Sequence, residues 1–368
     1  MSDQPEGINV QELDPNMKPP ELKTESIQWY SPLEAPFQIT GFAWFEKEGL
    51  YRRMPQSPSH PLSHGVQSLA NCTAGGQVRF RTSSSKLFVK VVLAGIANMY
   101  HMPATGQCGF DCYIGEPGEQ KYISTTRYDH NQIEFSAPLF EWSNVSSEMR
   151  MITLNFPLYQ GVKELQIGLT SDAEVAGPAP FADDRRVIVY GTSITQGGCA
   201  SRPGMCFTNI LSRSIPREFI NVGFSGSGRG EPEVAHVLAQ IERPALLVLD
   251  YEGNAGQPEQ FRQTLPAFIR IYRERHATVP ILVISKIRFA KERFDPVLAQ
   301  LAEERKQIAR ETVAAFADAG DKHITFFDGS TLLGDDYEEC TVDGGHPTDL
   351  GFIRMAEGLA PTFRQLLK

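Results

Sequence analysis

The sequence has little of what marks several protein classes. Its six cysteines are scattered over 368 residues, no Lys/Arg block occurs, and no apolar run approaches the roughly 18 residues that span a bilayer. The N-terminus lacks the basic and apolar regions of a secretory signal. We therefore expect a cytoplasmic protein with reduced thiols and no membrane partner.

The charge balance is mildly acidic. Lys and Arg total 35 against 44 Asp and Glu, which gives a formal net charge of −9. A chain of this charge binds the negatively charged phosphate backbone of nucleic acids poorly, so we expect no nucleic-acid partner. A length of 368 residues with 41% hydrophobic residues is typical of two globular domains.

The N-terminal half predicts an antiparallel β-domain. Residues 1–24 are polar and proline-bearing, which predicts a flexible arm. Between residues 25 and 172, short β-rich runs such as QVRFRT alternate apolar with polar side chains and are separated by Gly, Pro, Ser and Asn. This pattern favours a β-sandwich of the jelly-roll kind. Residues 173–184 predict a linker.

Residues 185–368 predict an α/β domain. Apolar runs typical of strands occur at 187–190, 219–224, 245–250, 281–285 and 324–328. Helical stretches alternate with them at about 205–215, 232–241, 257–275, 294–319 and 348–367. Strands that are apolar throughout indicate a parallel sheet covered on both faces, so we expect a three-layer αβα domain with a five-stranded parallel sheet.

Polar groups follow the predicted strands. Ser193 comes after the first strand, the turn that contains Gly226 after the second, and Asn254 after the third. Asp343 and His346 lie in the loop after the fifth. The carboxyl ends of parallel strands meet at one edge, so we expect these groups to converge there.

This set of groups is suited to acyl transfer. Ser193 would be the nucleophile, His346 the base that accepts its proton, and Asp343 the group that orients the imidazole. The backbone N–H groups of Ser193 and Gly226 and the amide of Asn254 would stabilise the oxyanion. These groups supply all the chemistry required, so we expect no metal and no cofactor.

Four sequence blocks and one upstream motif carry a family resemblance. The blocks GTSITQGG, NVGFSGSG, EGNAG and DGGHPTDLGF resemble those of the SGNH (GDSL-type) hydrolase superfamily, in the same chain order. The segment GFDCY, residues 109–113, resembles the GxDLY motif of the β-domain that precedes some bacterial SGNH esterases. The resemblance implies a flavodoxin-like strand order and the same roles for the five site residues named above.

The sequence departs from the family pattern at three places. Thr192 stands where the superfamily usually has Asp, and Cys112 replaces the Leu of GxDLY. Glu252 and Ala255 replace the usual residues around Asn254. Thr192, Glu252 and Arg229 flank the predicted pocket, so we also name them as candidate substrate contacts.

The resemblance implies a carbohydrate esterase. Two-domain proteins of this kind suggest removal of acetyl groups from saccharides such as acetylated xylo-oligosaccharides, as an acetylxylan esterase does. One alternative is a short-chain lipase or thioesterase, which should carry an apolar segment near the four blocks; none is evident in the sequence. The other is a catalytically silent carbohydrate-binding protein. An exposed sheet in the β-domain would allow a homo-oligomer.

Several motifs also have simpler interpretations. The pairs Cys108/Cys112 and His60/His64 lack the further ligands of a zinc site, and we expect solvated histidines at the second pair. The GSGRG turn lacks the spacing of a nucleotide cradle, and GTSIT lacks the second glycine of an α/β-hydrolase elbow. Trp29, Trp44 and Trp142 all lie in the β-rich half, where they either pack in the core or line a sugar-binding face.

Overall fold

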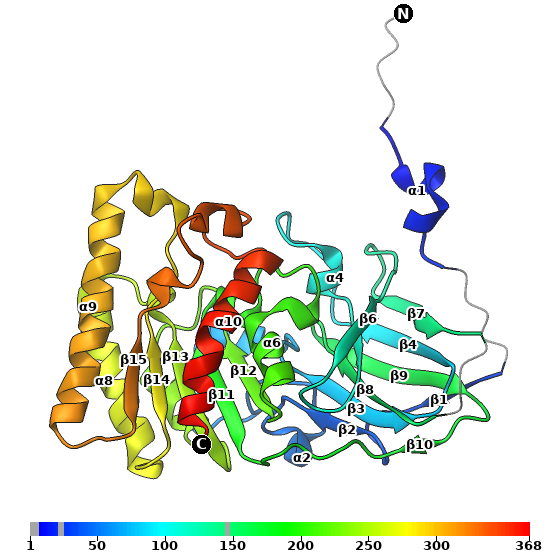
Figure 1. Cartoon of the computed structure of the whole chain (residues 1–368), viewed down its shortest axis with the longest axis horizontal. Helices are drawn as coiled ribbons and strands as arrows, with labels where there is room; N and C mark the ends of the chain where they lie inside the picture. Colours follow the sequence, from blue (N-terminus) through cyan, green and yellow to red (C-terminus); the bar gives the residue numbers. More distant parts are fainter. Residues whose placement is uncertain (1–6, 21–25, 144–147) are drawn as a thin grey trace, which may run out of the picture.

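The computed structural model describes residues 7–20, 26–143 and 148–368. A β-sandwich and an α/β domain lie side by side (Figure 1), and residues 7–20 contact the sandwich through a hydrogen bond from Arg127 to the Asn16 carbonyl at 3.2 Å. This N-terminal segment contains the short helix α1 (Val10–Leu13) and a 3₁₀ turn. Its apolar side chains, such as those of Ile8 and Leu13, are exposed. The rest of the predicted arm lies outside the described residues.

The sandwich consists of two antiparallel sheets. One has the order β1 (Ile27–Tyr30), β9 (Val162–Thr170), β4 (Lys86–Leu93), β7 (Glu134–Glu141). The other has the order β10 (Val175–Ala176), β3 (Gln77–Thr82), β8 (Arg150–Asn155), β5 (Asp111–Ile114), β6 (Lys121–Thr125), with β2 (Gln38–Thr40) beside β3. Val78 and Phe80 of the alternating β3 segment point into the shared core. The predicted sandwich is confirmed.

The second domain contains the predicted parallel sheet. Its order is β12 (Phe219–Gly223), β11 (Arg186–Gly191), β13 (Pro244–Asp250), β14 (Ile281–Ile284), β15 (Ile324–Phe327), and all four pairings are parallel. This is the flavodoxin-like order, in which the direction of strand addition reverses beside β11. The predicted fold class is confirmed.

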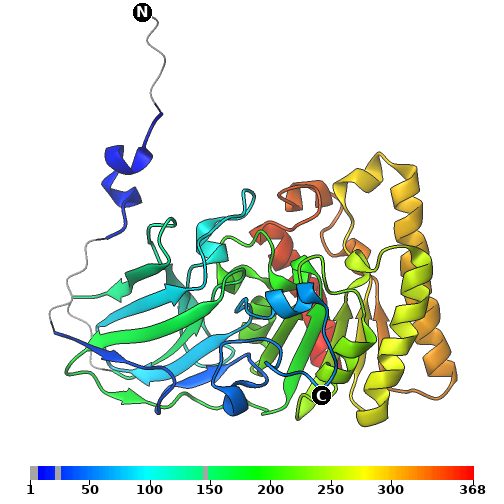
Figure 2. The same cartoon turned by 180° about the vertical axis from the view of Figure 1, so that it is seen from behind.

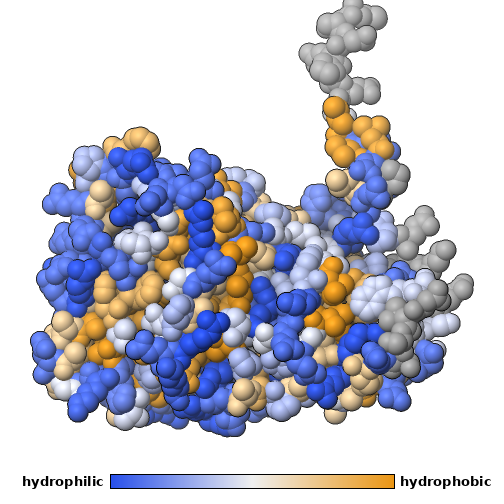
Figure 3. Space-filling view, in the orientation of Figure 1, coloured by the Kyte–Doolittle hydropathy of each residue, from blue (hydrophilic) through white to orange (hydrophobic). Residues whose placement is uncertain are grey.

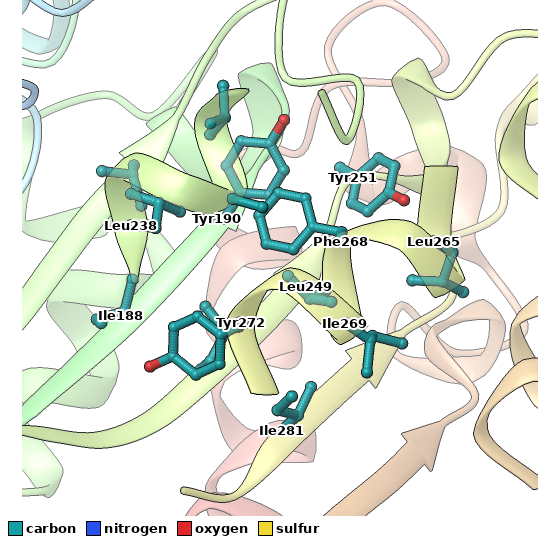
Figure 4. Packing of buried hydrophobic residues seen from close by; sticks show 14 of the residues in the cluster. Ile188, Tyr190, Leu238, Leu249, Tyr251, Leu265, Phe268, Ile269, Tyr272 and Ile281 are labelled. Carbon is teal, nitrogen blue, oxygen red and sulfur yellow. The ribbon is translucent and has the colours of Figure 1, made fainter. Parts of the chain in front are cut away.

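Helices cover both faces of this sheet because its strands are apolar on both sides. Ile188 and Tyr190 of β11 point toward α7 (Pro232–Leu238), α8 (Pro258–Arg275) and α9 (Pro296–Asp318). Val187 and Val189 point toward α6 (Phe207–Ser214) and α10 (Asp349–Leu366). In Figure 4 the rings of Tyr190 and Phe268 are stacked, with centroids 5.1 Å apart.

Two helices begin two residues later than the sequence predicts, for local reasons. Pro203–Met205 form a 3₁₀ turn, so α6 begins only at Phe207. Helix α9 begins at Pro296 because the carboxylate of Asp295 accepts hydrogen bonds from the first free N–H groups, at Val297 and Leu298. No helix among the described residues is both long enough and apolar enough to cross a membrane.

A segment of the β-rich half belongs to the core of the α/β domain. The β-domain part of the chain includes the short helices α2 (Phe45–Glu48), α3 (His64–Leu69) and α4 (Ala104–Gln107). Val66 of α3 packs in the same cluster as Ile188 and Tyr190, and Figure 2 shows the chain around α3 beside the parallel sheet. The two cores are therefore not separated at a single position in the sequence.

The motif that resembles GxDLY ties the two domains together. Asp111 is fully buried and accepts hydrogen bonds from the backbone N–H of Gly204 at 2.7 Å and from Asn155 at 2.7 Å. It also forms an ion pair with Arg202 at 2.9 Å. The Tyr113 hydroxyl accepts a second hydrogen bond from Arg202, at 2.6 Å. A buried carboxylate with all these partners fixes the loop after α5 against the sandwich.

Candidate active site

Ser193 occupies a tight turn between β11 and the short helix α5 (Ser193–Gln196). Thr192 caps this helix: its hydroxyl accepts a hydrogen bond from the N–H of Ile194, while the hydroxyl of Thr195 accepts one from the N–H of Thr192, both at 3.2 Å. This reciprocal pair is a capping box. The threonine that departs from the family pattern is therefore a competent helix cap, and it is buried.

The structure brings Ser193, His346 and Asp343 into one hydrogen-bonded chain. Ser193 Oγ lies 2.8 Å from His346 Nε2, and His346 Nδ1 lies 2.7 Å from Asp343 Oδ2. The other carboxylate oxygen of Asp343 accepts the backbone N–H groups of Gly345 and His346, at 3.0 and 2.8 Å. The loop before α10 thus holds the carboxylate rigidly beside the imidazole.

This arrangement fixes the electrostatics of the histidine. Partial burial opposes ionisation of Asp343, but the N–H of His346 and its imidazole donate to the carboxylate, and the net effect lowers its pKa. An ionised Asp343 favours a proton on Nδ1, which leaves the lone pair of Nε2 directed at the serine hydroxyl. The imidazole is therefore in position to accept that proton.

The three predicted oxyanion donors lie around the end of the sheet. The backbone N–H groups of Ser193 and Gly226 make no hydrogen bond to any described residue. The side-chain amide of Asn254 makes only a long one, 3.4 Å, to the Phe224 carbonyl. Gly226 has a φ of +65°, a left-handed conformation that glycine adopts without strain. All three donors are therefore available to a ligand.

A cavity of about 400 Å³ opens over Ser193. Asn254 and His346 line it together with Ser193, and its apolar wall consists of Ile194, Ile287, Phe289, Leu298 and Met355. A wider cavity of about 700 Å³ contains Gly226 and shares Gly253 and Asn254 with the first. Asn254 therefore stands between the two cavities, and Gly226 faces the wider one.

The structure changes the expectation for two of the predicted substrate contacts. Glu252 is only 2% exposed and does not line the Ser193 cavity. Its carboxylate accepts the N–H of Lys286 at 3.1 Å and lies 3.7 Å from Arg305 Nε. Burial, only partly offset by these partners, raises the pKa of Glu252 to about 7. Because its carboxylate contacts Lys286 and Arg305 and does not reach the Ser193 cavity, we assign Glu252 a structural role.

Arg229 likewise lies outside the Ser193 cavity. Its guanidinium donates to the carbonyl of Gly226 at 2.9 Å, and its side chain lines the wider cavity. Thr192, the third candidate, does line the Ser193 cavity, but its hydroxyl is engaged in the helix cap.

Sequence reasoning missed two residues that the sandwich contributes. The hydroxyl of Tyr159 donates to the backbone carbonyl of Ser193 at 3.2 Å. Nε2 of His101 lies 3.9 Å from Asp343 Oδ2, and its ring meets that of His346 edge to face, with centroids 5.7 Å apart. Both come from loops of the other domain, so no local sequence signal marked them.

A buried carboxylate beneath the nucleophile turn was also missed. Asp250, at the end of β13, accepts a hydrogen bond from Thr195 Oγ1 at 2.8 Å. Burial raises the pKa of Asp250 to about 7, against the effect of that hydrogen bond. A signal did exist here, because an acidic residue that ends an apolar strand such as PALLVLD must face the active edge of the sheet.

Three exposed apolar side chains lie where α9 begins, at a place that the sequence did not single out. Phe294, Val297 and Leu298, where α9 begins, are 81%, 64% and 39% exposed, and Leu298 lines the Ser193 cavity. Figure 3 shows the hydropathy of one face of the molecule, where apolar side chains lie among polar ones. We call these three residues the apolar rim.

The other candidate residues fall into structural roles. Cys108 and Cys112 are free and buried. The ring of His60 stacks on His236, with centroids 4.2 Å apart, while His64 is exposed in α3. The three tryptophans are half-buried, and none lines the Ser193 cavity. Trp142, for example, stacks on Phe140 at 4.1 Å, as expected for packing.

Comparison with known proteins identifies the family. Residues 184–364 match the GDSL-like lipase/acylhydrolase family, and residues 27–175 match the GxDLY domain, the N-terminus of SGNH-hydrolase-type esterases. A putative GDSL-like lipase from Bacteroides ovatus is 30% identical over 93% of this chain and 98% of that one, with a TM-score of 0.83. The chain belongs to the GDSL-like lipase/acylhydrolase family. It is thus a member of the SGNH/GDSL carboxylic ester hydrolases with an N-terminal GxDLY domain.

More distant structures share the fold of this GDSL-family member. The salicylyl-acyltransferase SsfX3 of a tetracycline biosynthetic pathway is 17% identical over 94% of this chain and 98% of its own, with a TM-score of 0.74. A family two carbohydrate esterase from Clostridium thermocellum, solved with cellohexaose, is 13% identical over 90% of this chain and 99% of its own, with a TM-score of 0.59. No curated protein matches the sequence.

Proposed function

We propose that this GDSL-family protein is a serine esterase that removes acetyl groups from carbohydrates such as acetylated xylo-oligosaccharides. The observation that carries the proposal is the chain of hydrogen bonds from Ser193 through His346 to Asp343, at 2.8 and 2.7 Å. Those distances are within reach for proton transfer and for tautomer control.

In the proposed reaction Ser193 Oγ attacks the ester carbonyl while His346 Nε2 accepts the hydroxyl proton. The tetrahedral oxyanion is held by the N–H groups of Ser193 and Gly226 and by Asn254. The C–O bond to the sugar then breaks, and His346 returns the proton to the departing alcohol. A water molecule, deprotonated by the same imidazole, attacks the acetyl-serine, and acetate leaves as Ser193 regains its proton.

Two observations support a sugar ester as substrate. The fold is shared with a carbohydrate esterase solved with a bound cellohexaose. The cavity is also lined by Lys291 and Asn254, whose side chains can donate hydrogen bonds to sugar hydroxyls. Lys291 is exposed and lines the cavity, so its ammonium is available to a ligand.

The apolar rim favours a second candidate, an esterase for longer acyl chains. Leu298 and Phe289 line the cavity, and the exposed Phe294 and Val297 adjoin Leu298 in the chain; these apolar side chains would gain free energy by covering an acyl tail. The Bacteroides ovatus protein named a putative GDSL-like lipase is in line with this candidate. The two candidates share the chemistry and differ only in the group that occupies the cavity.

Acetate release from acetylated xylo-oligosaccharides tests the proposal, together with a p-nitrophenyl ester series from acetate to octanoate. We expect acetate release and a steep fall in kcat/KM with chain length, both abolished in Ser193→Ala. A preference for octanoate would instead favour the lipase candidate. Inertness of the wild type toward every ester, with saccharide binding retained, would point to a silent carbohydrate-binding protein.

A further inference from the structure

Three metal-binding side chains meet beside Ser193. His101 comes from the loop before α4, Cys199 from the loop after α5, and His346 from the loop before α10. One donor atom of each lies within 4.8 Å of the corresponding atoms of the other two. The cluster thus gathers two imidazoles and a thiol from three loops and from both domains.

Two donor atoms of the cluster form no hydrogen bond within the described part of the chain, although the other imidazole nitrogen of His101, Nε2, lies 3.9 Å from Asp343 Oδ2. Nδ1 of His101 is buried without a hydrogen bond, and Cys199 Sγ makes none to any described residue. Cys199 also has a φ of 73°, in the left-handed region that residues with a Cβ seldom adopt. The buried thiol is therefore held at the cluster by a backbone conformation that costs free energy. Residues with such strained backbones are concentrated at functional sites.

The rings of the cluster are positioned by packing. The ring of Tyr100 stacks on that of His101 with centroids 4.6 Å apart, and the ring of His101 meets that of His346 edge to face. An imidazole held in this way loses little conformational entropy when it takes a ligand.

We propose that His101, Cys199 and His346 form a reversible Zn²⁺ site that switches the enzyme off. Thiolate and imidazole are the ligands that zinc prefers, and three protein ligands leave a fourth position for water. Tetrahedral zinc places such ligand atoms about 3.5 Å apart, so small side-chain rotations close the present separations. Binding displaces the proton of the Cys199 thiol to solvent as the Zn–S bond forms.

Zinc and the catalytic hydrogen bonds compete for the same imidazole. In the structure Nε2 of His346 faces Ser193 and Nδ1 faces Asp343. Coordination of either nitrogen removes one of these two interactions. This part of the inference rests on the proposed function, because only an esterase that needs His346 is inhibited when the metal takes it.

Binding is tested first, without any use of activity, by titrating the full chain with Co²⁺ as a spectroscopic probe for the zinc site. We expect one equivalent to bind with a thiolate-to-cobalt absorption band, which added Zn²⁺ removes. Cys199→Ser should lose that band, and His101→Asn should weaken binding at least about tenfold. The matched controls Cys72→Ser and His323→Asn should bind as the wild type does. A missing thiolate band, or equal binding by Cys199→Ser, would overturn the site.

Inhibition is tested separately on p-nitrophenyl acetate, with each variant compared with its own metal-free rate. Zn²⁺ should inhibit the wild type with the midpoint found in the titration, and a chelator should restore the rate. Cys199→Ser should need at least about tenfold more Zn²⁺. If the protein has no esterase activity, the proposed function fails while the cobalt spectrum still decides the site. Full activity at saturating Zn²⁺ would overturn the switch.

Discussion

The two domains place their polar groups differently. In the sandwich, neighbouring antiparallel strands end at opposite edges, so polar loop residues are divided between the two ends. In the α/β domain, all five strands are parallel and end at one edge. Ser193, Asn254 and His346 are therefore close together although 153 positions separate the first from the last. The common strand direction therefore explains how the α/β domain assembles these groups from distant segments.

The sandwich nevertheless reaches that site. Asp111 and Arg202 fix its position, and Tyr159 and His101 extend to the turn of Ser193 and to Asp343. The reacting groups come from the α/β domain, and the sandwich only supports them. We therefore expect substitutions at the edge of the parallel sheet to reduce activity far more than substitutions in the loops of the sandwich.

The largest effect is expected for Asp343→Asn. The amide keeps the backbone hydrogen bonds from Gly345 and His346, so the fold should be retained, but it allows the wrong tautomer of His346. We expect kcat on p-nitrophenyl acetate to fall about 10³–10⁴-fold. The matched control is Asp335→Asn, an exposed carboxylate in the same region. A loss below about tenfold, well short of the range given by mutagenesis of such triads, would show that Asp343 does not orient the base.

A smaller loss is expected for Asn254→Ala. Removing one oxyanion donor should lower kcat about 10²–10³-fold, with KM nearly unchanged because the oxyanion exists only near the transition state. Steady-state measurement of kcat and KM checks this, with the exposed-loop variant Asn131→Ala as the control. If KM rises while kcat stays constant, Asn254 binds the substrate and does not stabilise the oxyanion.

The contribution of the sandwich is tested by Tyr159→Phe. The variant loses the hydrogen bond to the Ser193 carbonyl, a net interaction of about 1 kcal/mol, so we expect an effect on kcat of no more than about tenfold. Tyr30→Phe, elsewhere in the sandwich, is the control. A loss as large as that of Asn254→Ala would contradict the division between the domains.

The smallest effect concerns stability at the buried Asp250. Because burial raises its pKa to about 7, the folded state keeps a proton that the unfolded chain releases near its ordinary pKa. Stability is therefore lost as pH rises from about 4 to about 7. Asp250→Asn should reduce this loss by about 1 kcal/mol or more, measured by urea unfolding at pH 5 and pH 8. The exposed Asp318→Asn should follow the wild type. Parallel pH dependences for wild type and Asp250→Asn would contradict the assignment.

The sequence allowed the fold to be predicted because the two domains have different periodicities. Alternation in QVRFRT and apolar runs such as ALLVLD distinguish a half-exposed strand from a fully covered one. The groups that follow each strand at the active edge could be named for the same reason, since topology places Ser193, Asn254 and His346 together.

What the sequence did not reveal depends on packing between the domains. Tyr159 and His101 lie on sandwich loops whose position is set by contacts such as Asp111 with Arg202, over 91 positions of sequence. Glu252 stands beside Asn254 in the chain, yet its side chain turns into the protein toward Lys286. Leu298 lines the cavity because it lies in the first turn of α9, which borders the cavity. The sequence alone therefore does not show which side chains near a site residue point toward the cavity.

Covalent labelling of Ser193 tests the central claim most directly. A fluorophosphonate, which forms a stable tetrahedral adduct only with an activated nucleophile, is incubated with the full chain, and the adduct is located by peptide mass spectrometry. The account predicts a single adduct on Ser193, none in Ser193→Ala, and strongly slowed labelling in Asp343→Asn. Labelling of another residue, or undiminished ester hydrolysis by Ser193→Ala, would contradict it.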